Sequence, residues 1–318
     1  MNEKRVLIIG AAGFVGNHLI DYILANCKNW KVTATKMPRE KIEKKVEVRD
    51  LDITMPEQIN QLLSEVQPDY IFHLAAQSSV ALSWKSPKLT VNINIIGSIN
   101  VLDAVRNMEK HPRVLLIGSG EEYGYVKEDE IPIQEDNNTR PGNIYAVTKV
   151  CQNMIGHLYS EAYGMRVIST RSFNHTGPNQ APQFVVPDFC HQVAEIEAGK
   201  QEPVIKVGNL SAKRDFTDVR DVVRAYCMLM EKGQAGETYN VGSGHSIAIQ
   251  EILNQILAKS DKKIEVYQDP TKFRPVDVPI IEADISKLQA ATGWKPEISL
   301  DQTITETLQI YRKRELML

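Results

Sequence analysis

The sequence predicts an α/β fold in which a doubly wound parallel sheet is joined by a smaller C-terminal α/β lobe. Short runs of β-branched residues alternate with helical patterns through the first half of the 318 residues. These runs are almost continuously apolar, which is typical of parallel strands buried on both faces. After Arg171 the alternation becomes irregular. A chain of this length can form one large α/β domain or two domains that share a core.

The first half contains the elements of the expected sheet. Apolar runs predict strands at residues 5–10, 31–35, 70–76, 113–119 and 166–171, with one further strand ending just before Asp50. Apolar residues at helical spacing predict helices between them, at residues 14–24, 59–66, 93–105 and 145–163. Strands that alternate with helices form βαβ units, so the sheet is expected to be parallel.

The second half predicts fewer regular elements. We expect, in order, a loop at 174–184, a helix at 186–198, a strand within 202–209, a helix at 218–231, a strand and turn at 237–244, a loop at 272–279 and a helix at 300–312. The expected division places a nucleotide-binding domain at 1–173 and 218–247, and a second domain at 174–217 and 248–318.

Composition excludes several classes of function. A net charge of −3 provides no basic field for nucleic acid, so no nucleic-acid partner is expected. The four cysteines are too far apart for a metal site and are expected to be free thiols in a reducing compartment. No signal peptide is evident, and no apolar stretch approaches the roughly 20 residues that span a bilayer. We therefore expect a cytoplasmic protein with no metal and no membrane partner.

A glycine-rich loop follows the first expected strand and opens the first expected helix. Its sequence, GAAGFVG, spaces three glycines so that the chain can turn tightly and a pyrophosphate can lie on the helix N-terminus. This context predicts a Rossmann dinucleotide site rather than a glycine turn without ligand. The expected contacts are Gly10, Ala12, Gly13, Phe14, Val15 and Gly16.

The end of the second expected strand favours NADP(H) over NAD. An acidic residue about 20 positions after the loop would bind the ribose 2′-hydroxyl and repel a 2′-phosphate. Here Thr35 and Lys36 stand at that place, with Arg39 nearby. The alternative is that Lys36 and Arg39 are ordinary solvated charges of a loop.

Two further segments are expected to contact the cofactor. Asp52 follows the third expected strand and is placed to reach the adenine amino group, with Ile53 packed on the ring. Leu74, Ala75 and Ala76 follow the fourth strand, where small residues let the cofactor pass close to the backbone. The alanines also fit a simpler role in packing, and this applies more to Ala75 than to Ala76.

Tyr145 and Lys149 form a YxxxK pattern that places both side chains on one helical face. An ammonium beside a phenol favours the phenolate, so Lys149 is expected to lower the pKa of Tyr145. Tyr145 can then exchange a proton with a carbonyl or alcohol oxygen while a nicotinamide exchanges hydride with the carbon. Ser119, at the carboxyl end of a strand, is expected to hydrogen-bond that oxygen. A surface Tyr–Lys pair is the alternative.

Together these motifs resemble those of extended short-chain dehydrogenases/reductases, the NAD-dependent epimerase/dehydratase family. The resemblance covers essentially the whole chain and includes the blocks HLAAQSSVALSW, NIYAVTK, RSFNHTGP, VGNLSAKRDFTDVRD and RPVDVP. Likeness is strongest to the members that act on GDP-sugars. It implies a Ser119–Tyr145–Lys149 proton relay, a GDP-sugar substrate and a homodimer formed by two helices of each subunit.

The resemblance also implies residues that hold the substrate. These are Ser119, Gly120, Glu121, Asn174, Lys206, Arg214, Arg274 and Asp277. Guanidinium groups suit a diphosphate because they bind its oxygens in pairs. Local alternatives remain open: an Asx turn for Asn174, a structural ion pair with Asp215 or Asp218 for Arg214, and ordering of Arg274 by Asp277.

The stretch GSGEEYG leaves two principal reactions open. In the related 4,6-dehydratases, a glutamate two positions after the relay Ser/Thr removes the C5 proton, and Glu121 occupies that place. However, Ser119 and Gly120 stand where those enzymes usually have threonine and a hydroxyl or acidic residue, and the loop GAAGFVGNH differs from their TGQDG.

The resemblance therefore favours NADPH-dependent reduction of the C4 ketone of GDP-4-keto-6-deoxy-D-mannose, giving a GDP-6-deoxyhexose such as GDP-D-rhamnose. Dehydration of GDP-mannose and 4-epimerisation are the alternatives. A non-catalytic dinucleotide sensor is disfavoured because the whole relay is present.

Overall fold

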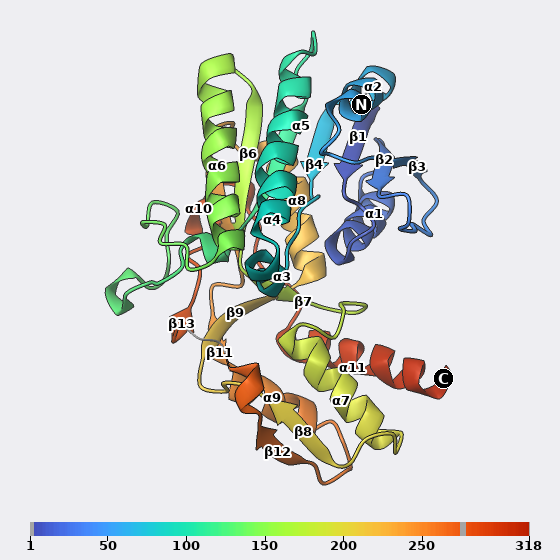
Figure 1. Cartoon of the computed structure of the whole chain (residues 1–318), viewed down its shortest axis with the longest axis vertical. Coiled ribbons are helices and arrows are strands. Elements are labelled where there is room, and N and C mark those ends of the chain that lie inside the picture. Colours follow the sequence, from blue (N-terminus) through green and yellow to red (C-terminus); the bar gives the residue numbers. More distant parts are fainter. Residues whose placement is uncertain (1–2, 274–277, 318) are drawn as a thin grey trace.

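The computed structural model describes residues 3–273 and 278–317 and contains a seven-stranded parallel sheet (Figure 1). The strand order is β10-β6-β5-β4-β1-β2-β3, and every neighbouring pair is parallel. The strands are β1 (Lys4–Ile9), β2 (Trp30–Lys36), β3 (Glu47–Asp50), β4 (Tyr70–His73), β5 (Arg113–Ser119), β6 (Arg166–Ser172) and β10 (Thr238–Val241). The prediction of a doubly wound parallel sheet is therefore confirmed.

Helices cover both faces of this sheet because its strands are apolar on both faces. The helices of this part are α1 (Phe14–Asn26), α2 (Pro56–Val66), α3 (Val80–Lys85), α4 (Pro87–Val91), the π-helical turn η1 (Asn92–Ile96), α5 (Gly97–Arg106), α6 (Ile144–Tyr163), α8 (Val219–Lys232) and α10 (Ser286–Thr292). Val6 and Ile8 pack into the cluster formed with α1 and α8, whereas Leu7 and Ile9 pack into the cluster formed with α2 and α5. Short 3-10 turns are η2 (Gly120–Glu122), η3 (Glu128–Glu130) and η4 (Pro270–Lys272).

Two predicted boundaries in this part were wrong. The fourth strand ends at His73 rather than at residue 76, because the chain leaves the sheet there to pass against the glycine loop. The helix expected at 93–105 starts earlier, as α4, and continues through η1 into α5. Within η1, the side chain of Asn94 bonds the backbone of Gln77 and the hydroxyl of Thr148, which ties the segment after β4 to α6.

A smaller lobe lies below the sheet in Figure 1 and has its own apolar core. Its elements are β7 (Asn174–Thr176), α7 (Val185–Glu197), β8 (Val204–Val207), β9 (Lys213–Asp218), β11 (Ser246–Ala248), α9 (Ile249–Leu257), β12 (Glu265–Gln268), β13 (Ile280–Ile281) and α11 (Leu300–Met317). Strand β9 is central, since β7, β11 and β13 all pair with it.

The last helix extends past its predicted end at residue 312. Contacts with the rest of the lobe hold its final turns: Arg312 forms two hydrogen bonds of 2.7 Å with the carboxylate of Glu197, and Lys200 Nζ lies 2.9 Å from a Glu315 carboxylate oxygen. No helix in the described parts of the chain is both long enough and apolar enough to cross a membrane.

Candidate active site

The glycine loop lies at the carboxyl end of β1 and meets the segment that follows β4. Gly10 has a φ of +81°, and a Cβ at this position would lie 2.6 Å from the backbone nitrogen of Ala75. Its N–H donates to Thr35 Oγ1 at 3.1 Å. Only glycine combines this dihedral angle with so close an approach, so the loop is shaped by backbone rather than by side chains.

The N-terminus of α1 is open toward this loop. Its N-cap is Gly13, and no side chain caps the first turn, so backbone N–H groups are available to an anion. Ala12 accepts a 3.0 Å hydrogen bond from Asn17, and the ring of Phe14 lies parallel to that of His175 at 6.4 Å. The loop therefore fits a pyrophosphate, and Phe14 connects it with the substrate side of the site.

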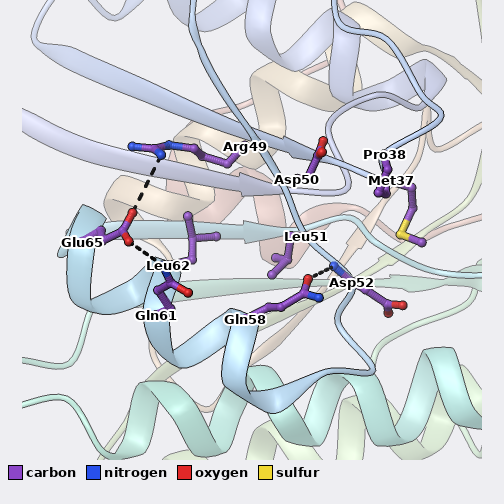
Figure 2. A pocket seen from close by; sticks show the side chains of 10 residues that line it. All are labelled: Met37, Pro38, Arg49, Asp50, Leu51, Asp52, Gln58, Gln61, Leu62 and Glu65. Atoms are coloured by element: carbon purple, nitrogen blue, oxygen red, sulfur yellow. Dashed lines mark hydrogen bonds and ion pairs between the residues drawn. The ribbon is translucent and has the colours of Figure 1, made fainter.

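Lys36 lies at the end of β2 but is bound to a neighbouring strand. Its Nζ is 2.5 Å from a carboxylate oxygen of Asp50, its register partner on β3, while Arg39 is exposed on the following loop. A surface hollow of about 480 Å³, lined by Met37, Pro38 and Asp50 among others, opens between β3 and α2 (Figure 2). Asp50 is an acidic neighbour that the sequence analysis did not include in the cofactor site.

The two residues expected at adenine are placed differently from one another. Asp52 is partly exposed, and its Oδ1 accepts hydrogen bonds from Thr54 N and Oγ1 at 2.9 and 2.7 Å. The side chain of Ile53 is buried and packs against Gly97 of α5, where a Cβ would lie 2.6 Å from Ile53 Cδ1. Ile53 thus faces the interior, because Gly97 leaves room for it there.

Ser119, Tyr145 and Lys149 come together at the carboxyl end of β5. Ser119 is the last residue of β5, and the other two lie in the first turns of α6, whose N-cap Asn143 accepts a 2.8 Å hydrogen bond from Ala146 N. The Ser119 hydroxyl is near enough to Tyr145 to lower its pKa, and Lys149 Nζ lies 5.9 Å from the centre of the Tyr145 ring. The structure therefore assembles the three groups of the predicted relay.

The predicted lowering of the Tyr145 pKa is wrong in this structure. Burial raises the pKa of Tyr145, the nearby Ser119 hydroxyl opposes this rise, and Glu121 and Glu122 add to it. The ammonium of Lys149 does not touch the hydroxyl, because it donates to Ile117 O at 2.7 Å and to Gln152 Oε1 at 2.9 Å. Burial lowers the pKa of Lys149 to about 8. Tyr145 is therefore held as a neutral phenol.

Glu121 and Glu122 are adjacent in sequence but differ in environment. Glu121 is partly exposed at the site, and its Oε2 accepts a 3.2 Å hydrogen bond from Asn143 Nδ2. Glu122 is fully buried beneath the site and accepts a 2.9 Å hydrogen bond from Ser119 N. Sequence reasoning missed Glu122, because nothing in the letters EE distinguishes a surface carboxylate from a buried one.

His73 is a second residue that the sequence analysis did not single out. Ser98 Oγ donates its only proton to Asn94 O at 2.7 Å and therefore accepts in its other contact. His73 Nε2, which lies 3.0 Å from Ser98 Oγ, thus carries the proton of the hydrogen bond between His73 and Ser98. Its Nδ1 is then a buried acceptor without a hydrogen-bond partner. Burial and the charge of Lys149 lower the pKa of His73 to about 3, so the ring is neutral.

The residues expected to hold the substrate are only partly gathered. Gly120 is buried against Phe173, and Asn174 is exposed at the start of β7. Arg214 lies on β9, where Nη1 donates to Val278 O at 2.7 Å rather than to Asp215 or Asp218. Lys206 is exposed on β8 in the smaller lobe. Arg274 and Asp277 lie outside the described residues.

The described residues contain no group of three or more His, Cys, Asp or Glu side chains that could hold a metal ion.

Fold and relay together define an extended short-chain dehydrogenase/reductase. The chain belongs to the family described as GDP-mannose 4,6 dehydratase, whose model matches residues 7–307. The predicted family and fold class are thereby confirmed.

Relatives within the family carry out different reactions. The chain is 33% identical to GDP-6-deoxy-D-mannose reductase of Pseudomonas aeruginosa over 98% of both chains. It is 28% identical to GDP-mannose 4,6-dehydratase of Yersinia enterocolitica, over 95% of this chain and 92% of that one.

Solved structures show the same range. The structure of RMD from Pseudomonas aeruginosa complexed with NADPH has a TM-score of 0.88 at 32% identity, covering 98% of this chain and 99% of that one. UDP-glucose 4-epimerase of Thermus thermophilus in complex with NAD has a TM-score of 0.86 at 28% identity, covering 97% and 99%.

Proposed function

We propose that this protein reduces the C4 ketone of GDP-4-keto-6-deoxy-D-mannose with NADPH and forms a GDP-6-deoxyhexose such as GDP-D-rhamnose. The observation that carries the proposal is the relay: Ser119 at the carboxyl end of β5, with Tyr145 and Lys149 in the first turns of α6, on the same edge of the sheet as the glycine loop. A tyrosine at this place can give its proton to a carbonyl oxygen while a nicotinamide gives hydride to the carbon.

Each relay residue has one role in this proposal. Bound NADPH supplies the hydride. The hydroxyl of Ser119 orients the C4 oxygen, Tyr145 Oη gives its proton to that oxygen, and the Lys149 ammonium stabilises the negative charge that Tyr145 acquires. With a pKa of about 8, Lys149 is protonated at neutral pH and therefore carries that positive charge.

The cofactor contacts proposed are those of the glycine loop, of the segments after β2, β3 and β4, and of Tyr145 and Lys149, with Lys149 holding the nicotinamide ribose. Gly10 leaves a gap against Ala75 that a side chain would fill, and the first turn of α1 is uncapped, which fits a dinucleotide. We propose a preference for NADP over NAD because Lys36 and Arg39 place positive charge after β2, where a 2′-phosphate would lie. The carboxylate of Asp50 opposes this preference. The NADPH complex of a 32% identical protein supports this choice.

The dehydratase is the second candidate, and Glu121 is the observation that favours it. A dehydratase needs a base at C5, and the Glu121 carboxylate lies two residues after Ser119 with a hydrogen bond from Asn143. In a reductase the same carboxylate would instead accept a hydrogen bond from the sugar, and Asn174 and Arg214 are proposed as further substrate contacts.

The nucleotide-binding domain is proposed at 1–173 and 218–247.

We also propose a cytoplasmic homodimer whose interface is the outer face of α3, α4, η1 and α6. Large apolar side chains are exposed on these helices although the helices pack on one another. Trp84 and Met154 are each 61% exposed, and Leu89, Ile96 and Leu158 are exposed as well. Such a patch is unusual on a monomer. Light scattering tests the dimer, and Met154→Glu with Leu158→Glu is expected to give a monomer.

The enzymatic proposal is tested by offering the purified protein NADPH with GDP-4-keto-6-deoxymannose, and separately GDP-mannose alone. Loss of NADPH absorbance with the keto sugar, and no reaction with GDP-mannose, supports the reductase. Formation of a keto sugar from GDP-mannose without net consumption of cofactor would instead establish the dehydratase.

A further inference from the structure

Glu122 is a buried carboxylate directly beneath the proposed relay. Its side chain has no exposed surface. Oε1 accepts from Ser119 N at 2.9 Å, while Oε2 accepts from Arg171 Nε at 2.9 Å and from Asn153 Nδ2 at 3.2 Å. Three elements therefore converge on one carboxylate: the end of β5, strand β6 and helix α6.

These partners favour the ionised form of Glu122. All three are donors, so a proton on the carboxyl would have no acceptor among them. Burial raises the pKa of Glu122, and Arg171, Ser119 N–H and Lys149 counteract that rise. A buried charge is tolerated when it is paired and hydrogen-bonded in this way.

Space around the carboxylate is restricted, so the contacts are fixed. Gly118 lies directly against it, and a Cβ on Gly118 would collide with Glu122 Oε1 and with the backbone of Thr170. Ser119 Oγ in turn accepts from Glu121 N at 3.2 Å, so Ser119 is held from both sides of the 3-10 turn. The position of Ser119 thus depends directly on Glu122.

We propose that Glu122 is a positioning residue of the relay: its carboxylate fixes Ser119 at the end of β5 and, lying against Gly118 next to the Ile117 carbonyl that binds Lys149, keeps the Lys149 ammonium charged. This inference rests on the proposed function, because in that function the ammonium stabilises Tyr145 after it has given up its proton. A carboxylate near an ammonium disfavours loss of the ammonium proton.

The carboxylates near the relay raise the pKa values of its groups. Glu122 raises the pKa of both Tyr145 and Lys149, and Glu121 adds to the effect on Tyr145. Arg171 faces Glu122 from β6 and also lies over the ring of Tyr123, at 4.7 Å from its centre. From β4 the neutral ring of His73 faces Lys149 and contributes no charge.

The test is the pH profile of kcat/KM for ketone reduction in Glu122→Gln. Glutamine keeps the size and one acceptor oxygen but removes the charge and turns an NH2 group toward Arg171 or Asn153. We expect about 10-fold lower kcat/KM at neutral pH, and an alkaline limb that moves from near pH 8 to about 1 pH unit lower. A folded variant whose alkaline limb does not move overturns the proposal.

A matched control is Glu197→Gln in the smaller lobe. Glu197 also forms a two-bond pair with an arginine, Arg312, but contacts no relay residue. Its kcat/KM and pH profile are expected to match the wild type. If both variants shift the limb alike, the effect is not specific to Glu122 and the proposal fails.

Two measurements keep the test decisive. Glu122→Asp keeps the charge but shortens the reach to Ser119, so kcat is expected to fall while the limb stays; unchanged kcat contradicts the positioning role. An NMR titration of the Lys149 side chain, assigned by comparison with Lys149→Arg, reports its ionisation without substrate. If no keto sugar is reduced, the proposed function fails, yet the NMR midpoint of Glu122→Gln still tests Glu122: a midpoint lower than wild type supports it, and an unchanged midpoint contradicts it.

Discussion

The two ends of the proposed site are built differently. On the sheet side, buried side chains fix each group: Lys149 is held by two hydrogen bonds, Ser119 by Glu122, and Gly10 by the segment at Ala75. On the side of the smaller lobe, Asn174 and Lys206 are exposed, and Arg214 is held through a backbone carbonyl. The proposed relay is therefore preorganised, whereas two of the proposed substrate contacts, Asn174 and Lys206, are open to solvent.

This difference separates two kinds of expected effect. Changes on the sheet side act on residues whose geometry is already set, so they should alter kcat or cofactor binding. Changes on the lobe side remove contacts that form with the substrate, so they should act mainly on KM. The predictions below test this separation, beginning with the largest expected effect.

Tyr145→Phe removes the proton donor and leaves the packing of the ring. We expect kcat to fall about 1,000-fold or more, because general acid catalysis contributes up to about 10⁴-fold. NADPH affinity, measured by fluorescence titration, should remain near wild type. Tyr163→Phe, at the exposed far end of the same helix, is the control and should retain full activity. A Tyr145→Phe enzyme with more than a tenth of wild-type kcat contradicts the assigned role.

Gly10→Ala should abolish tight NADPH binding, by about 100-fold or more, because the added methyl group collides with Ala75 and the left-handed φ is strained. Gly293→Ala is a control for strain alone, since Gly293 has a φ of +78° with nothing within 4 Å of the added atom. Calorimetry should show a loss of stability in both variants and a loss of NADPH binding only in the first. Equal loss of binding would show that the approach to Ala75 does not matter.

Arg214→Ala should raise KM for the GDP-sugar by about 10- to 100-fold with little change in kcat, since a guanidinium–phosphate contact contributes about 1.5–3 kcal/mol. Arg314→Ala, which alters a surface arginine of the same lobe that bonds Asn179, should leave both constants unchanged. Steady-state kinetics with varied sugar nucleotide distinguish the two. A fall in kcat at constant KM would place Arg214 on the preorganised side of the site instead.

Lys36→Ala should reduce the preference for NADPH over NADH by about 10-fold, because one cation near the 2′-phosphate is removed. Asp50→Asn should increase the same preference, since Lys36 loses the carboxylate 2.5 Å from its Nζ. The ratio of kcat/KM for the two cofactors measures both. The assignment fails if the two variants change that ratio in the same direction.

Glu121→Gln is expected to have the smallest effect, with reduction of the keto sugar within about 5-fold of wild type, because a hydrogen bond to a sugar contributes about 1 kcal/mol. Loss of most activity would assign Glu121 an essential proton-transfer role, as in a dehydratase. Measuring deuterium exchange at C5 of the sugar in the same reaction separates these outcomes.

The sequence predicted best what depends on local pattern. The sheet, the glycine loop and the Ser119–Tyr145–Lys149 group follow from apolar runs, from glycine spacing and from two residues one helical turn apart. The burial of Glu122 and the unpartnered nitrogen of His73 could not be predicted, because they depend on side chains from strands and helices that are distant in sequence. The Tyr145 pKa was predicted with the wrong sign because its environment, not its neighbour at i+4, decides it.

The most direct test of the account follows the hydride in a single turnover. NADPH deuterated on the transferring face is mixed with GDP-4-keto-6-deoxymannose and excess protein, and the sugar product is examined by NMR. The account predicts one deuterium at C4 for each NADPH oxidised. Product formation with no deuterium at C4, or with NADPH left unoxidised, would contradict the assignment of this protein as a reductase.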